Sequence, residues 1–95
     1  MTSSPATWAG DVQAVVLVRT VDPGAARLQR LLRRVPGVSA AWYLAGDADL
    51  LLLVSCQGLP ELRRLITRLR IEGGATATTT HLVLRRLDAG ADQAS

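Results

Sequence analysis

Two stretches of the chain repeat one pattern, a short apolar run followed by a helix signal. The first run, VVLV, begins at Val15 and leads through VDPG into LQRLL. The second, LLLV, begins at Leu51 and leads through CQGLP into LRRLI. Short apolar runs bounded by turn residues are typical of buried strands. The repetition therefore predicts a duplicated unit of one strand and one helix.

Both helix signals have defined ends. Asp22 and Pro23 suit the N-cap and first position of one helix, which Pro36-Gly37 ends. Pro60 begins the second helix, and Gly73-Gly74 closes it. Apolar side chains recur every three or four residues in both, at Leu28, Leu31, Leu32 and Val35 and at Leu62, Leu65, Ile66 and Leu69. Arginines fill the opposite sides, as is usual for solvated helix faces.

Four strands are expected around these helices, over Ala14 to Thr20, Val38 to Ala45, Leu50 to Cys56 and Ala75 to Leu87. The order strand, helix, strand, strand, helix, strand is that of a split βαβ duplication. Right-handed crossovers place the first and third strands in the middle of the sheet and the other two at its edges. We therefore predict an α+β fold, a ferredoxin-like βαββαβ domain with a four-stranded antiparallel sheet and two helices on one face.

The two central runs also predict an interface. They are apolar at every position, so both of their faces need cover, whereas two helices cover only one face of such a sheet. A second copy of the chain, packed sheet to sheet, is the simplest cover for the other face. Such a homodimer would also enlarge the small core of a 95-residue chain.

Composition and charge exclude several classes of protein. The net charge of +3 comes from eleven arginines, and these fall mostly on two helix faces without the stacking aromatics of a single-strand binder. The single cysteine, Cys56, excludes an internal disulfide and fits a reducing compartment. His81 has no second histidine or cysteine nearby, so we expect no metal site. Without a signal peptide or a long apolar segment, we expect a cytoplasmic protein with no membrane contact. Because most of the arginines lie on two solvated helix faces, we also expect no direct DNA binding.

From Ala14 to Leu87 the chain resembles the effector-binding domain, or RAM domain, of the Lrp/AsnC (leucine-responsive/asparagine) regulators. The resemblance is carried, in order, by VVLVRTVDPG, VPGVSAAWYLAGDADLLLLV, LPELRRLI and TTTHLVLRRL. Its hallmark is a Gly-x-aromatic-Asp hairpin before an apolar strand, here Gly46-Asp47-Ala48-Asp49. Ala48 stands where the family usually has Tyr or Phe, and Leu50 where another aromatic is frequent. Either the site is widened for a larger apolar side chain or the pocket is lost.

The resemblance implies a binding module and not an enzyme, with no cofactor. It also implies a homodimer, often in a ring of dimers with small molecules, typically amino acids, bound between dimers. Full regulators carry an N-terminal helix-turn-helix of about 60 residues, whereas here we expect a flexible arm over 1–11, the RAM-like domain over 12–87 and a flexible tail over 88–95. Such a stand-alone module would regulate transcription or metabolism through a partner, for example a full-length Lrp/AsnC regulator.

The residues that match the family's ligand-contacting regions are Ala45, Gly46, Asp47, Ala48, Asp49, Thr78 and Thr80. An amino acid offers an ammonium group, which needs a carboxylate, and a carboxylate, which needs hydroxyl or N–H donors. We expect Asp49 to orient the loop or hold the ammonium, and Gly46 to allow close backbone approach. Thr78 and Thr80 would supply hydroxyls from a strand face shared with Thr76.

The same residues also have a purely structural interpretation. Gly-Asp-x-Asp forms an ordinary hairpin turn, in which Asp bonds its own backbone. Threonines are good strand formers at a sheet edge. For Asp47 we expect a solvent-facing position in the turn.

Other classes share this topology. A dimeric α/β-barrel enzyme of the small monooxygenase or isomerase kind would need acid-base groups, for which the chain offers little beyond Asp49 with His81. The ACT domain, another amino-acid sensor, differs mainly in how its dimers assemble. An RNA-recognition sheet would need exposed aromatics on the central strands, where VVLV and LLLLV stand.

Overall fold

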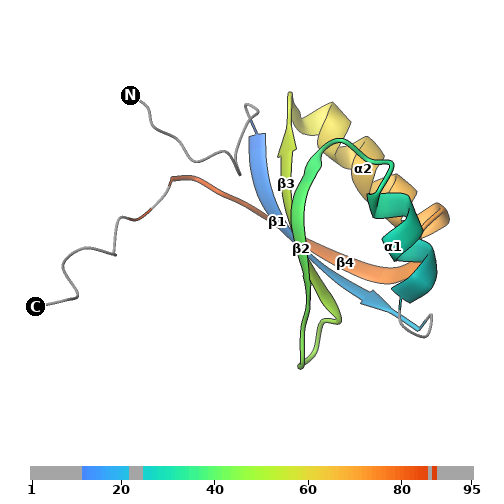
Figure 1. Ribbon diagram of the computed structural model, residues 1–95. Helices are drawn as coiled ribbons and strands as arrows, with labels where there is room; N and C mark the ends of the chain where they lie inside the picture. The colour runs from blue at the N-terminus through green and yellow to red at the C-terminus, as the bar shows by residue number, and fades with distance from the viewer. Residues whose placement is uncertain (1–11, 22–24, 86, 88–95) are drawn as a thin grey trace, which may run out of the picture.

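The structure, a computed structural model, describes residues 12–21, 25–85 and 87. The strands are β1 (Val12–Thr20), β2 (Val38–Tyr43), β3 (Leu50–Cys56) and β4 (Ala75–Leu82), and the helices are α1 (Ala26–Leu32) and α2 (Leu59–Ile71). All neighbouring strands are antiparallel, in the order β2-β3-β1-β4. Both helices lie on the same face of the sheet (Figure 1). The predicted βαββαβ fold, with the first and third strands in the middle, is confirmed.

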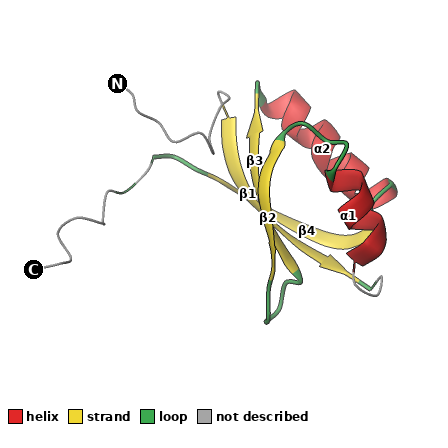
Figure 2. Cartoon of the chain, in the orientation of Figure 1, coloured by secondary structure: helices red, strands yellow, loops and turns green. Residues whose placement is uncertain are grey.

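The two helices form a layer over one face of the sheet (Figure 2), and the core residues lie between the two layers. Every second residue of the central strands is buried there, and these residues meet leucines from both helices: Ala14, Val16, Val18, Leu50, Leu52 and Val54 face Leu28, Leu31, Leu62, Leu65 and Leu69. Burying one such leucine fully contributes about 1.5–3 kcal/mol. The helix spacing read from the sequence therefore identifies the residues that hold the two layers together.

The opposite side of the sheet, which we call the open face, is also apolar. Val15 pairs with Leu53, and Leu17 with Leu51, and all four side chains are only partly buried. Trp42 stands beside Leu51 and is 51% exposed. Because exposed apolar surface of this extent marks interaction sites, the open face is where the sequence predicts a second copy of the chain.

Some element ends differ from the sequence predictions. Strand β1 begins at Val12 and not Ala14, β2 ends at Tyr43 and not Ala45, and β4 ends at Leu82 and not Leu87. The predicted start of the first helix at Asp22 and Pro23 lies outside the described residues, as do the expected arm over 1–11 and the tail over 88–95.

Helix α2 illustrates how local sequence fixes an element. Pro60 stands in its first turn, where a missing N–H costs no hydrogen bond. Glu61 in the same turn and Arg68 in the last turn complement the helix dipole. The carboxylate of Glu61 also accepts a hydrogen bond from the backbone N of Gln57 at 2.7 Å. The helix thus begins one residue before the predicted start at Pro60 and ends just before the predicted stop at Gly73-Gly74.

Candidate functional site

The hairpin between β2 and β3 is fixed to the sheet by Asp49. Its backbone oxygen accepts from Leu44 N at 2.8 Å, and its backbone N donates to Val18 O at 2.8 Å. Its side chain reaches further, because Oδ2 accepts from the backbone N of Thr20 at 2.9 Å. The Thr20 hydroxyl in turn donates to Gly74 O at 3.2 Å. Asp49 therefore joins the hairpin to the end of β1, which favours the loop-orienting role among those expected of it.

The tip of the hairpin stands clear of the rest of the described chain. Gly46 has a φ of 153°, and no atom lies within 4 Å of the position that a Cβ would take. Ala45 is exposed in the same loop. Gly46 is therefore used here for its backbone conformation. Close backbone approach to a ligand stays a prediction.

Asp47 and Ala48 line a hollow of about 220 Å³ on the open face. Its other walls are Leu17 and Arg19 on β1 and two residues of β4, Ala77 and Thr79. The register confirms that these strand residues share a face, since Leu17 pairs with Thr79 and Arg19 with Ala77. The hollow thus combines one carboxylate, one guanidinium and one hydroxyl with an apolar floor.

The structure does not bring the two expected threonines to this hollow. Thr78 pairs with Val18 and Thr80 with Val16, and both valines point into the core on the helix side of the sheet. Thr79, between them, faces the hollow instead. Thr76 lies where the register of β1 and β4 shifts, and its hydroxyl donates to Arg19 O at 3.1 Å.

Four residues of the hollow were missed by sequence reasoning, namely Leu17, Arg19, Ala77 and Thr79. The run VVLV is apolar at every position, so its alternation does not reveal which residues face the helices. Arg19 was the available signal, because a charged residue directly after a buried apolar run has to lie on a face open to solvent.

The acid-base pair considered for an enzyme is not assembled. His81 pairs with Val15, whereas the Asp49 carboxylate bonds Thr20, five residues further along β1. Five residues of strand span about 17 Å, which is far beyond hydrogen-bond reach. Within the described part of the chain, no three His, Cys, Asp or Glu side chains are grouped to hold a metal ion. None of the helices in that part is long and apolar enough to cross a membrane.

Structural comparison places this chain among short proteins and longer regulators. TTHA0845 from Thermus thermophilus is 28% identical, with a TM-score of 0.69 over 82% of this chain and 99% of that one. The hypothetical protein PHS023 from Pyrococcus horikoshii is 25% identical, with a TM-score of 0.67 over 79% and 92%. The transcriptional regulator NMB0573 from Neisseria meningitidis, solved with L-Met, is 18% identical, with a TM-score of 0.75 over 83% and 53%. This last likeness is one of fold.

A curated relative matches over a shorter stretch. Homocitrate synthase from Sulfurisphaera tokodaii is 34% identical over 58 residues, which are 61% of this chain and 13% of that enzyme. The chain therefore spans only a small part of the length of that relative.

The family itself is identified by a match over most of the chain. The family model of the Lrp/AsnC ligand binding domain matches residues 13–91, which include both helices, all of β2, β3 and β4, and the hairpin. The strand order and the one-sided helix layer agree with the Lrp/AsnC structures to which the fold is similar. The chain belongs to the Lrp/AsnC ligand-binding domain family.

Proposed function

We propose that this effector-binding domain takes an amino acid in the hollow beneath the β2–β3 hairpin. The observation that carries the proposal is the pair of opposite charges there, Asp47 on the hairpin and Arg19 on β1. A carboxylate accepts hydrogen bonds from an ammonium group, and a guanidinium binds a carboxylate in a two-pronged geometry. The hollow thus offers a partner to each charged group that every amino acid carries.

The apolar part of the hollow suits the ligand's side chain. Leu17, Ala48 and Ala77 form it, and the Thr79 hydroxyl can share the ligand's carboxylate with Arg19. Of the two positions that depart from the family pattern, Leu50 is 2% exposed and belongs to the core. Ala48 alone therefore enlarges the hollow, which favours an amino acid with a sizeable apolar side chain.

Oligomerisation of the chain would link ligand binding to a regulatory effect. We propose a homodimer through the open face, where Trp42, Leu51 and Leu53 lack full cover within the described chain, and a ring of such dimers in which ligand lies between dimers. Thr78 and Thr80 are on the edge strand β4, so in a ring they would meet a ligand or a neighbouring copy. Binding at the hollow would then strengthen or weaken the ring.

Two kinds of partner fit this role. NMB0573 is a transcriptional regulator solved with L-Met, so a full-length Lrp/AsnC regulator is one partner for mixed assemblies. The partial match to homocitrate synthase supports regulation of a metabolic enzyme as the other. We place the activity in the cytoplasm, in keeping with a single buried thiol.

A thermal-shift screen against the twenty amino acids tests the proposal. Ligand at 100 times its Kd adds about 2.7 kcal/mol of stability, which moves the melting temperature of a domain of this size by several degrees. We expect Arg19→Gln and Asp47→Asn to lose the shift. Arg30→Gln, on the exposed side of α1, should keep it. A wild-type protein that responds to no amino acid, or responds equally in all variants, would overturn the proposal.

A further inference from the structure

The helix layer carries most of the positive charge of the chain. This layer consists of α1 and α2 with the residues that directly follow them, Arg33, Arg34 and Glu72. It holds eight of the eleven arginines but only two of the eight acids, Glu61 and Glu72, and so has a net charge of +6, whereas the whole chain has +3. A local excess of this kind attracts and orients a partner of opposite charge.

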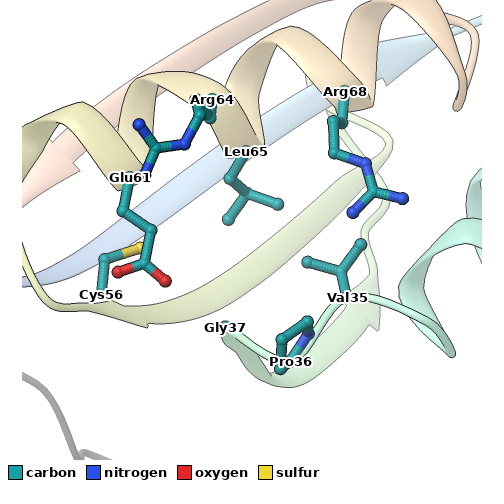
Figure 3. Close-up of a pocket in the computed structure, with 8 residues that line it drawn as sticks. All are labelled: Val35, Pro36, Gly37, Cys56, Glu61, Arg64, Leu65 and Arg68. Atoms are coloured by element: carbon teal, nitrogen blue, oxygen red, sulfur yellow. The ribbon is translucent and has the colours of Figure 1, made fainter.

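On one side of α2 the arginines already have acidic neighbours. Arg68 donates to the Glu72 carboxylate through Nε and Nη2 at 3.0 and 3.3 Å, and Arg34 lies 3.9 Å from the same carboxylate. The Arg64 side chain extends toward Glu61 (Figure 3). The two glutamates therefore offset part of the positive charge on this side of the helix, which borders the turn from α1 to β2.

The opposite side of α2 has arginines without acids. Arg63, Thr67 and Arg70 follow one another at helical spacing, so they lie along one line of the helix. Both arginines are exposed, and neither side chain makes a hydrogen bond or ion pair with another described residue. The neighbouring strand β4, ATATTTHL, contains no acid either. This side of α2 therefore presents two guanidiniums without a compensating carboxylate.

A hollow of about 340 Å³ lies beside this line, between α2 and the start of β4. Its lining comes from both elements: Thr67, Arg70, Ile71, Ala75 and Thr76. Ile71 is 69% exposed, so the hollow offers an apolar surface next to the guanidinium of Arg70. A second hollow, of about 460 Å³, shares Thr67 with the first, and its lining includes Arg63. We call the two hollows together the cationic groove.

We propose that the cationic groove binds an acidic segment of a partner protein, with carboxylates on Arg63 and Arg70 and an apolar side chain on Ile71. A guanidinium binds a carboxylate in a two-pronged geometry. The two arginines are seven residues apart, or about 10 Å along the helix, a length that an extended chain spans with three residues. Acids placed three residues apart in the partner thus match the groove.

A protein segment suits this groove better than a nucleic acid does. A DNA duplex carries one charge about every 1.7 Å, so its backbone would also lie close to Glu61 and Glu72 on the other side of the helix. Bases would find no stacking surface, since neither helix contains Trp, Tyr or Phe. Spaced carboxylates can instead pair with Arg63 and Arg70 alone.

Peptide binding to the whole chain tests the proposal. The probe is a labelled decapeptide with Glu at every third position and Ser and Leu between, and the control peptide has Gln in place of Glu. We expect fluorescence anisotropy to show saturable binding of the Glu peptide, which weakens as salt is added, and no binding of the Gln peptide. Arg63→Glu and Arg70→Glu should each weaken binding by about tenfold or more, because each removes a charge-assisted contact.

A matched variant separates the groove from the net charge of the chain. Arg85→Glu changes the net charge by the same amount as Arg63→Glu, but Arg85 is an exposed residue beyond the end of β4. It should therefore keep most of the affinity for the Glu peptide. Arg19→Gln separates the groove from the hollow beneath the β2–β3 hairpin, since it should leave peptide binding unchanged whatever that hollow binds.

Four results would overturn the proposal. Equal weakening by the Arg63, Arg70 and Arg85 variants would show attraction by net charge alone. Binding of the Gln peptide as tight as that of the Glu peptide would show that the guanidiniums are not used. Binding of a short DNA duplex as tight as that of the Glu peptide would show a surface for any polyanion. No binding of the Glu peptide to wild type at low salt would reject the groove.

Discussion

The Asp49 side chain accepts a hydrogen bond from the backbone N of Thr20 at 2.9 Å, although the two residues are 29 positions apart. Thr20 lies where β1 loses its regular register with β4, and the carboxylate bonds its N–H at this irregular point of the sheet. Asp49 thereby fixes the hairpin against β1. In this position Asp47 and Ala48 line one hollow together with Leu17 and Arg19. Asp49 is thus a positioning residue for the hollow in which we propose that an amino acid binds.

Removing this contact should destabilise the domain. We expect Asp49→Ala to lower the free energy of unfolding by about 1–3 kcal/mol, the usual cost of leaving a partly buried donor without its charged acceptor. Asp49→Asn should cost less, since its side-chain oxygen can still accept. Urea denaturation measures both. Asp47→Ala in the same hairpin is the control, and stability of Asp49→Ala equal to that of wild type would show that the contact is unimportant.

Two glycines, Gly58 at the start of α2 and Gly73 just after its end, give a second test of stability. A Cβ at Gly73 would lie 2.7 Å from Leu28 Cδ1 and 2.8 Å from Leu69 O. We expect Gly73→Ala to cost about 1–3 kcal/mol, because the helices would have to move apart. A Cβ at Gly58, the N-cap of α2, would meet only Pro60 Cδ, at 3.6 Å, so Gly58→Ala should cost only about 0.5–1 kcal/mol, the difference between glycine and alanine at an N-cap. Equal melting temperatures for the two variants would contradict the packing described here.

The ends of elements show what the sequence could predict. Strand β3 was predicted with the correct bounds, because a polar or turn residue stands on each side of its apolar run. The predicted extension of β4 to Leu87 was wrong, although HLVLRRL looks like a strand. Strand β4 ends early because it has reached the first residues of β1 and finds no further partner there. Val83 N donates to Gln13 O, and β1 begins one residue earlier, so Leu84 meets no partner strand within the described chain and is 93% exposed.

The candidate site was predictable only in part. The hairpin residues Asp47 and Ala48 were identified by resemblance, and both line the hollow. Thr79 could not be chosen over its neighbours, because Val16, Leu17 and Val18 opposite them are all apolar, so the sequence does not reveal which face of β4 lies on the helix side. The shift in register at Thr20 lies opposite Thr76, and a bulge of this kind depends on the pairing of two strands far apart in the chain.

The pair Arg68 and Glu72 predicts a dependence on pH. The hydrogen bond from Arg68, and then the charges of Arg68 and Arg34, hold the pKa of Glu72 below its ordinary value. A lowered folded-state pKa contributes stability above the unfolded pKa of about 4.3, and this is lost as the pH falls through the folded value. Wild type should therefore melt above Glu72→Gln at neutral pH and low salt, and at the same temperature in strong acid. A difference that persists unchanged into acid would refute this.

The open face predicts an assembly in solution. Wild type should sediment with at least twice the 10.1 kDa mass of one chain. We expect Leu53→Arg to give monomers, because it places a charge in the middle of the apolar face. Leu59→Arg is the matched control, since Leu59 is exposed at the start of α2 on the helix side. A monomeric wild type would contradict the proposed sheet-to-sheet dimer.

In the proposed site Asp47 and Arg19 hold the two charged groups of an amino acid, and exchanging their charges tests this arrangement. The affinity of the best amino acid is measured by calorimetric titration of wild type, of Arg19→Asp, of Asp47→Arg and of the double variant that carries both changes. We predict that each single change weakens binding by about tenfold or more, and that the double variant recovers part of the loss because opposite charges again line the hollow. Undiminished binding by the single variants, or no binding of any amino acid to wild type, would show that the hollow is not an amino-acid site.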